Sequence, residues 1–252
     1  MKDFEGLHAL VTGGSRGIGA AIAAALTQGG ARVTIMGRKN ADLAAQVASG
    51  NAAAYAVADL ADSAAFEKTV AGIAEKEPID ILVNNAGMAR SAPFLRTTDD
   101  DFEILFRVNV LGAVIASRVA LPGMMTRKFG RIINIASTAA LKGHPYISAY
   151  VTSKHALLGL TRSLAMEQAK TGVTVNAVCP GFTDTDMVDR AVDLIVAKTG
   201  RDAGSARAEI VKTSPMGRLI TPAEVADAVC FLARRESGGI TGTAITVAGG
   251  EA

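Results

Sequence analysis

Short runs of β-branched residues alternate with longer alanine-rich stretches along the chain, and this alternation constrains the fold more than any other feature. Parallel strands need a long crossover between them, which a helix usually supplies. Because such crossovers are right-handed, successive helices pack on both faces of the sheet. The sequence therefore predicts an α/β fold, a doubly wound parallel sheet with helices on both faces.

The predicted elements follow one another without a linker, repeat or low-complexity segment, so we expect a single domain over residues 1–252. Strands are predicted at 7–12, 32–36, 54–58, 79–83, 131–136, 173–178 and 244–247. Helices are predicted near 18–29, 40–49, 62–76, 99–125, 149–171 and 222–234.

One segment, residues 186–216, departs from this alternation. Its weak helical pattern is interrupted by Gly-Arg-Asp-Ala-Gly at 200–204 and is followed by Pro215. The segment comes just after a predicted strand, at the carboxyl end where ligands bind in such sheets. We therefore expect a mobile lid over the substrate. An ordinary surface excursion is the alternative.

The charge balance gives no sign of a nucleic-acid or membrane partner. The 252 residues include 26 basic and 24 acidic side chains, for a formal net charge of +2, without a long run of one sign. The most apolar long stretch, Val108 to Met125, contains Asn109 and Arg118. We expect a buried helix there rather than a membrane span.

Cysteine and histidine usage points away from disulfides and metals. Cys179 and Cys230 lie far apart and the three histidines are scattered, so neither a disulfide framework nor a zinc site is expected. Asp3 and Glu5 stand where a signal peptide would need an apolar core. These features favour a reducing, cytoplasmic location.

A glycine-rich turn, Thr12-Gly-Gly-Ser-Arg-Gly-Ile-Gly19, lies between the first predicted strand and the first helix. Glycines permit the tight turn and a close approach of the backbone to a ligand, and the helix N-terminus suits the charge of a pyrophosphate. The spacing differs from G-x-G-x-x-G, but the position indicates a Rossmann-type dinucleotide site. The turn residues expected to bind the cofactor are Gly13, Ser15, Arg16, Gly17, Ile18 and Gly19.

The residues after the second predicted strand, Met36-Gly37-Arg38-Lys39, bear on the choice of cofactor. NAD sites commonly carry an acidic residue here that binds the ribose 2′-hydroxyl, and this stretch has none. Arg38, together with Arg16, suits a 2′-phosphate because guanidinium groups form charge-assisted, potentially bidentate hydrogen bonds. We therefore expect NADP(H) to be favoured over NAD(H). A solvated turn at Arg38 and Lys39 is the alternative.

Tyr150 and Lys154 are four residues apart in a predicted helix and so share one face. A phenol has a pKa of about 10, and a nearby ammonium lowers it. Such a tyrosine can exchange a proton with an alcohol oxygen near neutral pH. The spacing alone is common by chance, so its meaning depends on the other motifs.

Together with the glycine-rich turn, Tyr150 and Lys154 resemble the short-chain dehydrogenase/reductase family, and further motifs of that family follow in order over essentially the whole chain. Asn84-Asn85-Ala86-Gly87 matches the family's N-N-A-G motif at the end of the fourth strand. Ser137 ends the fifth predicted strand, and Asn109 falls in the helix between these two motifs.

This resemblance implies that Asn109, Ser137, Tyr150 and Lys154 are the catalytic residues. Ser137 would orient the substrate oxygen, and Tyr150 would donate the proton in reduction and accept it in oxidation. Lys154 would lower the pKa of Tyr150 and bind the nicotinamide ribose, while Asn109 would hold a water that links Lys154 to solvent. Hydride would pass between nicotinamide C4 and the carbonyl carbon.

The resemblance also implies cofactor contacts at the ends of the later strands. In addition to Tyr150 and Lys154, the residues concerned are Asp59 and Leu60 near the adenine, Asn85, Ala86 and Gly87 of the N-N-A-G motif, and Pro180, Gly181, Thr183 and Thr185 near the nicotinamide amide and the pyrophosphate.

Within the family, residues 130–137, 153–156 and 176–182 resemble 3-oxoacyl-thioester reductases of acyl-carrier-protein or CoA substrates, and type II polyketide ketoreductases. We therefore expect NADPH-dependent reduction of the ketone of a 3-oxoacyl thioester or a related small-molecule ketone. One alternative is a secondary-alcohol or 3-hydroxy-acid dehydrogenase that works oxidatively. A more remote alternative is a non-catalytic dinucleotide-binding regulator.

The substrate side and the assembly are less well defined by the sequence. The helices near 99–125 and 149–171 have apolar faces on two sides, and the resemblance implies that they pair in a homotetramer or homodimer. Candidates for binding CoA or phosphopantetheine phosphates are Arg90, Arg96, Arg190, Lys198 and Arg201, unless these are ordinary solvated charges. Candidates for lining the substrate, with plain packing as the alternative, are Phe94, Leu141, His144, Phe182 and Met187.

Overall fold

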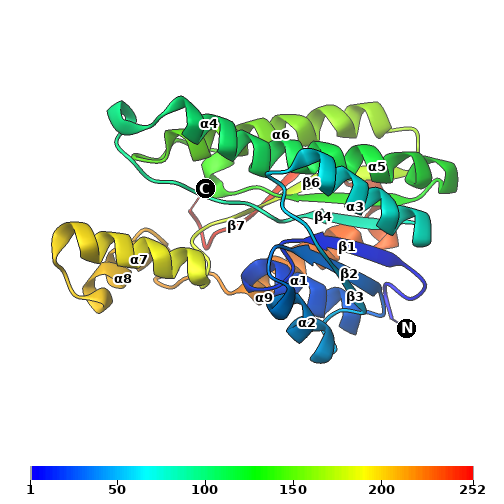
Figure 1. Cartoon of the computed structure of the whole chain (residues 1–252), viewed down its shortest axis with the longest axis horizontal. Helices are drawn as coiled ribbons and strands as arrows, with labels where there is room; N and C mark the ends of the chain where they lie inside the picture. The colour runs from blue at the N-terminus through cyan, green and yellow to red at the C-terminus, as the bar shows by residue number, and fades with distance from the viewer. Residues whose placement is uncertain (1, 252) are drawn as a thin grey trace.

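The computed structural model describes residues 2–251, which form one seven-stranded sheet with helices on both faces (Figure 1). The strand order is β3-β2-β1-β4-β5-β6-β7, and every pair is parallel. The order reverses between β1 and β4, which is the point where ligands bind in sheets of this type. The predicted doubly wound α/β fold is therefore confirmed.

The elements match the predicted alternation, and their ends lie within three residues of the predicted ones outside the helix at 99–125. The strands are β1 (His8–Thr12), β2 (Arg32–Gly37), β3 (Ala54–Val57), β4 (Ile81–Asn84), β5 (Gly130–Ile135), β6 (Val173–Pro180) and β7 (Ala244–Val247). The helices are α1 (Gly17–Gln28), α2 (Asn40–Ala48), α3 (Ser63–Lys76), α4 (Asp99–Phe106), α5 (Gly112–Arg127), α6 (Ser148–Gln168), α7 (Asp186–Thr199), α8 (Ala203–Val211) and α9 (Pro222–Ala233).

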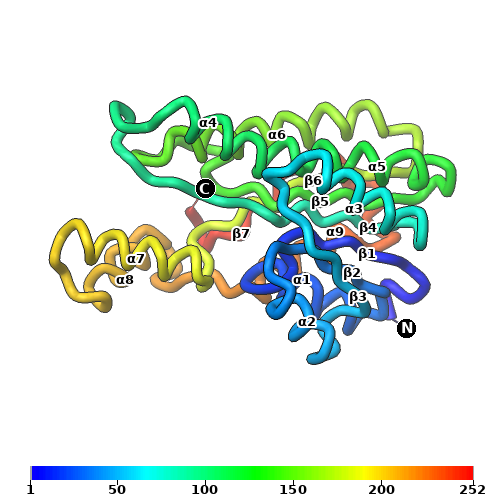
Figure 2. Tube along the Cα trace, in the orientation of Figure 1, coloured from blue at the N-terminus to red at the C-terminus, as the bar shows by residue number. Residues whose placement is uncertain are grey.

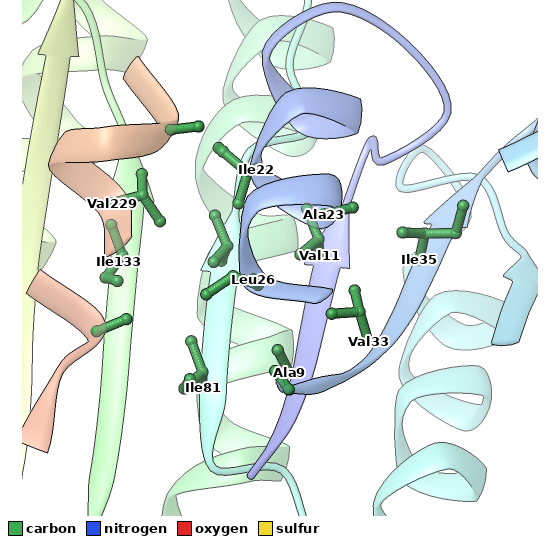
Figure 3. Close-up of a cluster of buried hydrophobic side chains, with 14 of the residues drawn as sticks. Ala9, Val11, Ile22, Ala23, Leu26, Val33, Ile35, Ile81, Ile133 and Val229 are labelled. Carbon is green, nitrogen blue, oxygen red and sulfur yellow. The ribbon is translucent and has the colours of Figure 1, made fainter. Parts of the chain in front are cut away.

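Two apolar layers hold the helices to the sheet (Figure 2). Helices α1, α2 and α9 lie on one face, and α3, α5 and α6 lie on the other. In Figure 3, Ile22 and Leu26 of α1 lie over Val11 and the neighbouring strands, with Val229 of α9 beside them. Strands covered on both faces are buried along their whole length, as every residue of β4 and β6 is.

The helix predicted at 99–125 is interrupted rather than uniform. It begins with a capping box in which Thr98 and Asp101 each bond to the other's backbone N–H. Between α4 and α5, residues Arg107–Leu111 form a π-helical turn. Such turns insert one residue into a helix and occur frequently at functional sites. This turn carries the buried Asn109, and the sequence did not predict it.

Together, α4, the π-helical turn and α5 (residues 99–127) make, within residues 2–251, the one helical stretch long and apolar enough by composition to cross a bilayer. Half of its most apolar 18-residue window is buried inside the fold. It packs against α3 and α6, as a core helix of a globular domain does. It therefore packs as the buried helix expected for Val108 to Met125.

Residues 186–216 form two helices that project from the carboxyl end of β6 (Figures 1 and 2). The predicted interruption at 200–204 is the boundary between them, since Gly200 ends α7 and the Asp202 side chain accepts the Ser205 N–H at the start of α8. The helices pack on each other through a small apolar cluster of Val188, Val192, Ala206, Ile210 and Leu219.

A buried polar bridge fixes helix α6 to the sheet. The Asn84 amide donates to Asn134 Oδ1 (2.8 Å), and the Asn134 amide donates to Thr161 Oγ1 (2.8 Å). The Thr161 hydroxyl then donates to the Leu157 carbonyl (2.8 Å). Because a polar group buried without a partner costs free energy, this chain favours one register of α6 against β4 and β5.

Replacing Thr161→Val is expected to lower the free energy of unfolding by about 1–3 kcal/mol, since the buried Asn134 amide loses its acceptor. Urea denaturation measures the effect. Thr152→Val is the matched control, because the Thr152 hydroxyl bonds to the carbonyl four residues earlier in the same helix but is exposed. Equal stability of the two variants would contradict this account of the bridge.

Candidate active site

The predicted site residues gather at one edge of the sheet, where the strands reach their carboxyl ends. The glycine-rich turn follows β1, the N-N-A-G motif follows β4, and Ser137 follows β5. Residues 180–185 lead out of β6, and the first turns of α6 bring Tyr150 and Lys154 to the same edge. Parallel strands make this convergence possible, because all their carboxyl ends face one way.

The glycine-rich turn is braced by the N-N-A-G motif. Thr12 Oγ1 accepts the N–H groups of Asn85 (3.0 Å) and Ala86 (3.1 Å). The Asn85 amide donates to the carbonyls of Thr12 (2.9 Å) and Gly13 (3.1 Å). Gly13 has a φ of 66°, and a Cβ there would lie 2.9 Å from the Ala86 Cα. Glycine is therefore required at this crossing on both counts.

Two helix N-termini meet beside this turn. Helix α1 begins at Gly17 and α7 begins at Asp186, and neither has a side chain bonded to its first free N–H groups. A Cβ on Gly17 would lie 3.1 Å from Cγ2 of Thr185, the residue that precedes α7. Unsatisfied N–H groups and two helix dipoles therefore favour an anion at this corner, whereas Asp186 and Asp189 add negative charge to the first turn of α7.

Both arginines expected at the ribose are exposed and lie near carboxylates. Arg16 Nη1 is 2.9 Å from Asp186 Oδ2, and Arg38 Nη1 is 4.0 Å from Asp59 Oδ2. The sequence after β2 shows no acidic residue, but the structure brings Asp59 across from the end of β3. Exposed pairs of this kind contribute about 0–1 kcal/mol, so either arginine remains available to another anion.

The remaining predicted cofactor residues near this end are partly structural. Leu60 is buried and packs against Gly112 of α5, and Ile18 packs on the core beneath α1. The Ser15 carbonyl accepts the Gln46 side-chain amide (3.3 Å). Gly19 lies so close to the Gly13 carbonyl that any Cβ would collide with it.

Tyr150 lies at the start of α6 with its phenol inside the site. Burial raises the pKa of Tyr150, and a hydrogen bond with the Ser137 side chain acts in the opposite direction. The prediction that Lys154 lowers this pKa is therefore wrong. The cost of removing water from a phenolate is the larger effect, and the Lys154 ammonium is directed to a backbone carbonyl instead.

Lys154 is 4% exposed, and its ammonium donates to the Ile135 carbonyl (2.8 Å) at the end of β5. Its Nζ lies 5.7 Å from the centre of the Tyr150 ring. Burial lowers the pKa of Lys154 to about 8, because the charged form loses its water. The amine therefore changes its charge within the range in which enzymes commonly work.

Asn109 is held rigidly in the π-helical turn. Its side chain accepts the Met88 N–H (2.9 Å) and donates to the Met88 carbonyl (3.0 Å) and to Ser153 Oγ (2.9 Å). A Cβ on Gly87 would lie 3.2 Å from Asn109 Oδ1 and 3.5 Å from Lys154 Nζ. Gly87 therefore stands between these two polar groups and leaves space there.

The segment after β6 is fixed by short-range hydrogen bonds. The Gly181 N–H donates to the Val247 carbonyl (3.0 Å), and the Thr183 hydroxyl donates to the Gly181 carbonyl (3.0 Å). The Thr185 hydroxyl donates to the Thr183 carbonyl (3.2 Å). Residues Pro180 to Thr185 thus form a defined path from the sheet to the lid helices.

The residues expected on the substrate side are only partly brought together. Phe94, Leu141, Phe182 and Met187 are exposed apolar side chains. His144 Nε2 is buried and has no hydrogen-bond partner among the described residues. All of the candidate cations are exposed, and Arg90 pairs with Asp101 (2.6 Å); the others are Arg96, Arg190, Lys198 and Arg201.

A separate hollow of about 370 Å³ lies between α4 and α6. Phe102, Phe106 and Leu111 line one side and Ala149, Thr152 and Ser153 the other. None of the predicted site residues lines it, so it is distinct from the site at the strand ends.

One residue of the site was missed by sequence reasoning. Cys179 is fully buried near the end of β6, beside the Ser137 backbone. It is close enough to Tyr150 and Lys154 to interact with both electrostatically. Burial raises the pKa of this thiol, so it stays neutral. Its place just before Pro180 was the available signal, because that position ends a strand at the site.

Comparison with known proteins agrees with this geometry. Residues 7–194 match the family model described as short chain dehydrogenase. The acetoacetyl-CoA reductase of Shinella zoogloeoides is 39% identical over 96% of this chain and 97% of its own length. The D-beta-hydroxybutyrate dehydrogenase of Cupriavidus necator is 36% identical over 98% of each chain.

A solved structure of a variant of actinorhodin polyketide ketoreductase with NADPH matches with a TM-score of 0.92 and 32% identity, covering 100% of this chain and 98% of that one. The resemblance to thioester and polyketide reductases that the motifs indicated is thereby confirmed. The fold is one that binds NAD(P). The chain therefore belongs to the short-chain dehydrogenase/reductase family and is an oxidoreductase that acts on hydroxyl or ketone groups.

Proposed function

We propose that this enzyme uses NADPH to reduce the ketone of a 3-oxoacyl thioester or a related small-molecule ketone, with Tyr150 as the proton donor. The observation that carries the proposal is the meeting of Ser137, Tyr150 and Lys154 at strand ends beside two open helix N-termini. Relatives named acetoacetyl-CoA reductase and polyketide ketoreductase support the same substrate class.

The chain offers a fitting site for the dinucleotide. Gly13 and Gly17 both have positive φ angles and lie close to Ala86 and Thr185, so the backbone of the turn can approach a ligand without intervening side chains. The N-termini of α1 and α7 would hold the pyrophosphate, and residues 85–87 and 180–185 would border the nicotinamide half. When bound, the cofactor supplies the hydride, and the protein binds and orients it.

Two exposed guanidinium groups favour NADP(H) over NAD(H). A 2′-phosphate carries more charge than a carboxylate and presents three oxygens, so it competes well for Arg16 and Arg38. The pairs that these arginines make with Asp186 and Asp59 are exposed and weak. Both arginines can therefore turn from these carboxylates to a 2′-phosphate at little cost.

The proton would come from the neutral phenol of Tyr150. Ser137 would hydrogen-bond the ketone oxygen and hold it next to that phenol. As the carbonyl carbon accepts hydride, its oxygen gains negative charge and takes the proton. Lys154 and Asn109 would form a proton path from solvent to the phenol through the space beside Gly87. This path would replace the proton on Tyr150 after each turnover.

The raised pKa of Tyr150 also favours reduction over the oxidative alternative. Reduction needs a protonated tyrosine, and a phenol with an ordinary or raised pKa is protonated at neutral pH. Oxidation of an alcohol needs a tyrosinate as base, which the same burial disfavours. Similarity to the D-beta-hydroxybutyrate dehydrogenase supports oxidation of a hydroxy acid as the second candidate function.

We infer that α7 and α8 act as the substrate lid of a single-domain enzyme. The start of α7 contacts the glycine-rich turn at two points, through Thr185 at Gly17 and Asp186 at Arg16. Arg207 of α8 pairs with Asp184 and Asp189 and so joins the two helices electrostatically. The lid is thereby anchored at the cofactor corner, and its far end can change position relative to the sheet.

A cytoplasmic location and a homodimer or homotetramer are inferred as well. The apolar side chains exposed on the α4–α5 helix, Phe106 and Leu111, border the hollow against α6. Pairing of two such faces would cover them and fill the hollow. Light scattering of the purified protein measures the assembly directly.

Replacing Tyr150→Phe is expected to lower turnover by about a thousand-fold or more, because the general acid and its positioning hydrogen bond are both lost. The dissociation constant of NADPH should stay unchanged, as measured by titration of cofactor fluorescence. Turnover near the wild-type value in this variant would refute the proton-donor role.

Replacing Arg38→Asp is expected to shift the ratio of kcat/KM for NADPH and NADH toward NADH. The new carboxylate repels the 2′-phosphate and can accept a bond from a free 2′-hydroxyl. Steady-state kinetics with both cofactors give the ratio, and Lys39→Asp is a neighbouring control. An unaltered ratio would mean that Arg38 does not bind the phosphate.

The low pKa of Lys154 means that this buried side chain lowers the free energy of unfolding by an amount that depends on pH. Between pH 8 and 10.5, the ordinary pKa of a lysine, the native state binds fewer protons than the unfolded state. The free energy of unfolding therefore rises with pH across that window. The cost is complete below pH 8, at about 3 kcal/mol for a shift of this size.

The stability of Lys154→Met relative to the wild type should therefore fall by about 3 kcal/mol as the pH rises from 8 to 10.5. Urea denaturation at several pH values measures the difference, in which the other titrating groups largely cancel. A difference that does not change with pH would show that Lys154 has an ordinary pKa in the folded protein.

A further inference from the structure

The segment that follows β7 folds back over the end of β6. Gly249 and Gly250 have φ angles of 60° and 92°, which favour glycine and reverse the chain. The N–H of Glu251 then donates to the Ala248 carbonyl (3.1 Å). As a result Glu251 is only 8% exposed, although carboxylates are rarely buried unless they are paired.

Glu251 joins two parts of the substrate side. Its Oε1 lies 3.5 Å from the ammonium of Lys142, in the loop that leads from Ser137 toward Tyr150. Its Oε2 lies against the end of β6, 3.0 Å from where a Cβ of Gly181 would be. Neither contact involves the glycine-rich turn or the two arginines of the cofactor corner.

The same segment also touches the exit of the lid. A Cβ on Gly249 would lie 2.7 Å from the Met216 side chain, and one on Gly250 would lie 3.4 Å from Pro215. Residues 249–251 therefore contact the loop after Ser137, the end of β6 and the return of the lid. An apolar side chain would cost less to bury at this point than a carboxylate does.

We propose that Glu251 is a positioning residue for the ketone substrate, acting through Lys142. Its ion pair holds the loop at 141–147, and the adjoining Gly249 and Gly250 contact the lid exit at Met216 and Pro215, so that the substrate side is formed before the ketone binds. This inference rests on the proposed function, because Ser137 and Tyr150 define where the substrate lies. Pre-formed binding surfaces increase affinity by removing the cost of ordering them.

The test compares Glu251→Gln, Lys142→Gln and the double variant. Each single variant is expected to raise the KM for a ketone that the wild type reduces by about 5- to 30-fold, with kcat and the NADPH dissociation constant within about threefold, since only substrate binding is weakened. The double variant should be no worse than the poorer single variant, because the pair is already broken. Lys142→Arg should retain a KM near the wild-type value.

Glu236→Gln removes a carboxylate that is fully on the surface and serves as the matched control. A KM within twofold of the wild type in both single variants, additive effects in the double variant, or an equal change in NADPH affinity would each overturn the proposal.

Hydrogen exchange gives a readout that does not depend on turnover. Glu251→Gln should speed exchange at residues 141–147 and 213–217 while leaving the glycine-rich turn unchanged. Unchanged exchange at both segments would overturn the positioning role. A wild-type protein that reduces no ketone would instead overturn the proposed function, so the two failures are distinguishable.

Discussion

The hydrogen bond from the Lys154 ammonium to the Ile135 carbonyl, 2.8 Å long, is the contact on which the site depends. It joins α6 to the end of β5 and so sets Tyr150 beside Ser137. It also holds a cation that is buried, and this burial lowers the pKa of Lys154 to about 8. Burial of the phenol acts in the other direction on Tyr150, so that the pair favours a neutral tyrosine and a titrating lysine.

Much of this arrangement could be predicted from the sequence, because local patterns determine it. The strand–helix alternation fixed the parallel sheet, and a parallel sheet brings strand ends to one edge. Motifs at those ends, such as the glycine-rich turn and Asn85, therefore had to lie together. Spacing along one helix placed Tyr150 and Lys154 on the same face.

The parts that could not be predicted depend on contacts between distant segments. The π-helical turn around Asn109 reflects its bonds to Met88 and Ser153, which no periodicity reveals. The direction of the Tyr150 pKa depends on how much water is excluded, and a spacing of four residues does not report that. Asp59 approaches Arg38 from a neighbouring strand, and Glu251 reaches Lys142 across the site.

The central claim is that this chain transfers hydride from NADPH to a ketone at the edge formed by β1, β4, β5 and β6. Deuterium transfer tests it most directly. The enzyme would be supplied with NADPH carrying deuterium at the reactive position of C4, together with acetoacetyl-CoA and a panel of cyclic ketones. The account predicts one deuterium on the carbinol carbon of a product, seen by mass spectrometry. Bound cofactor with no deuterated alcohol from any ketone would contradict it.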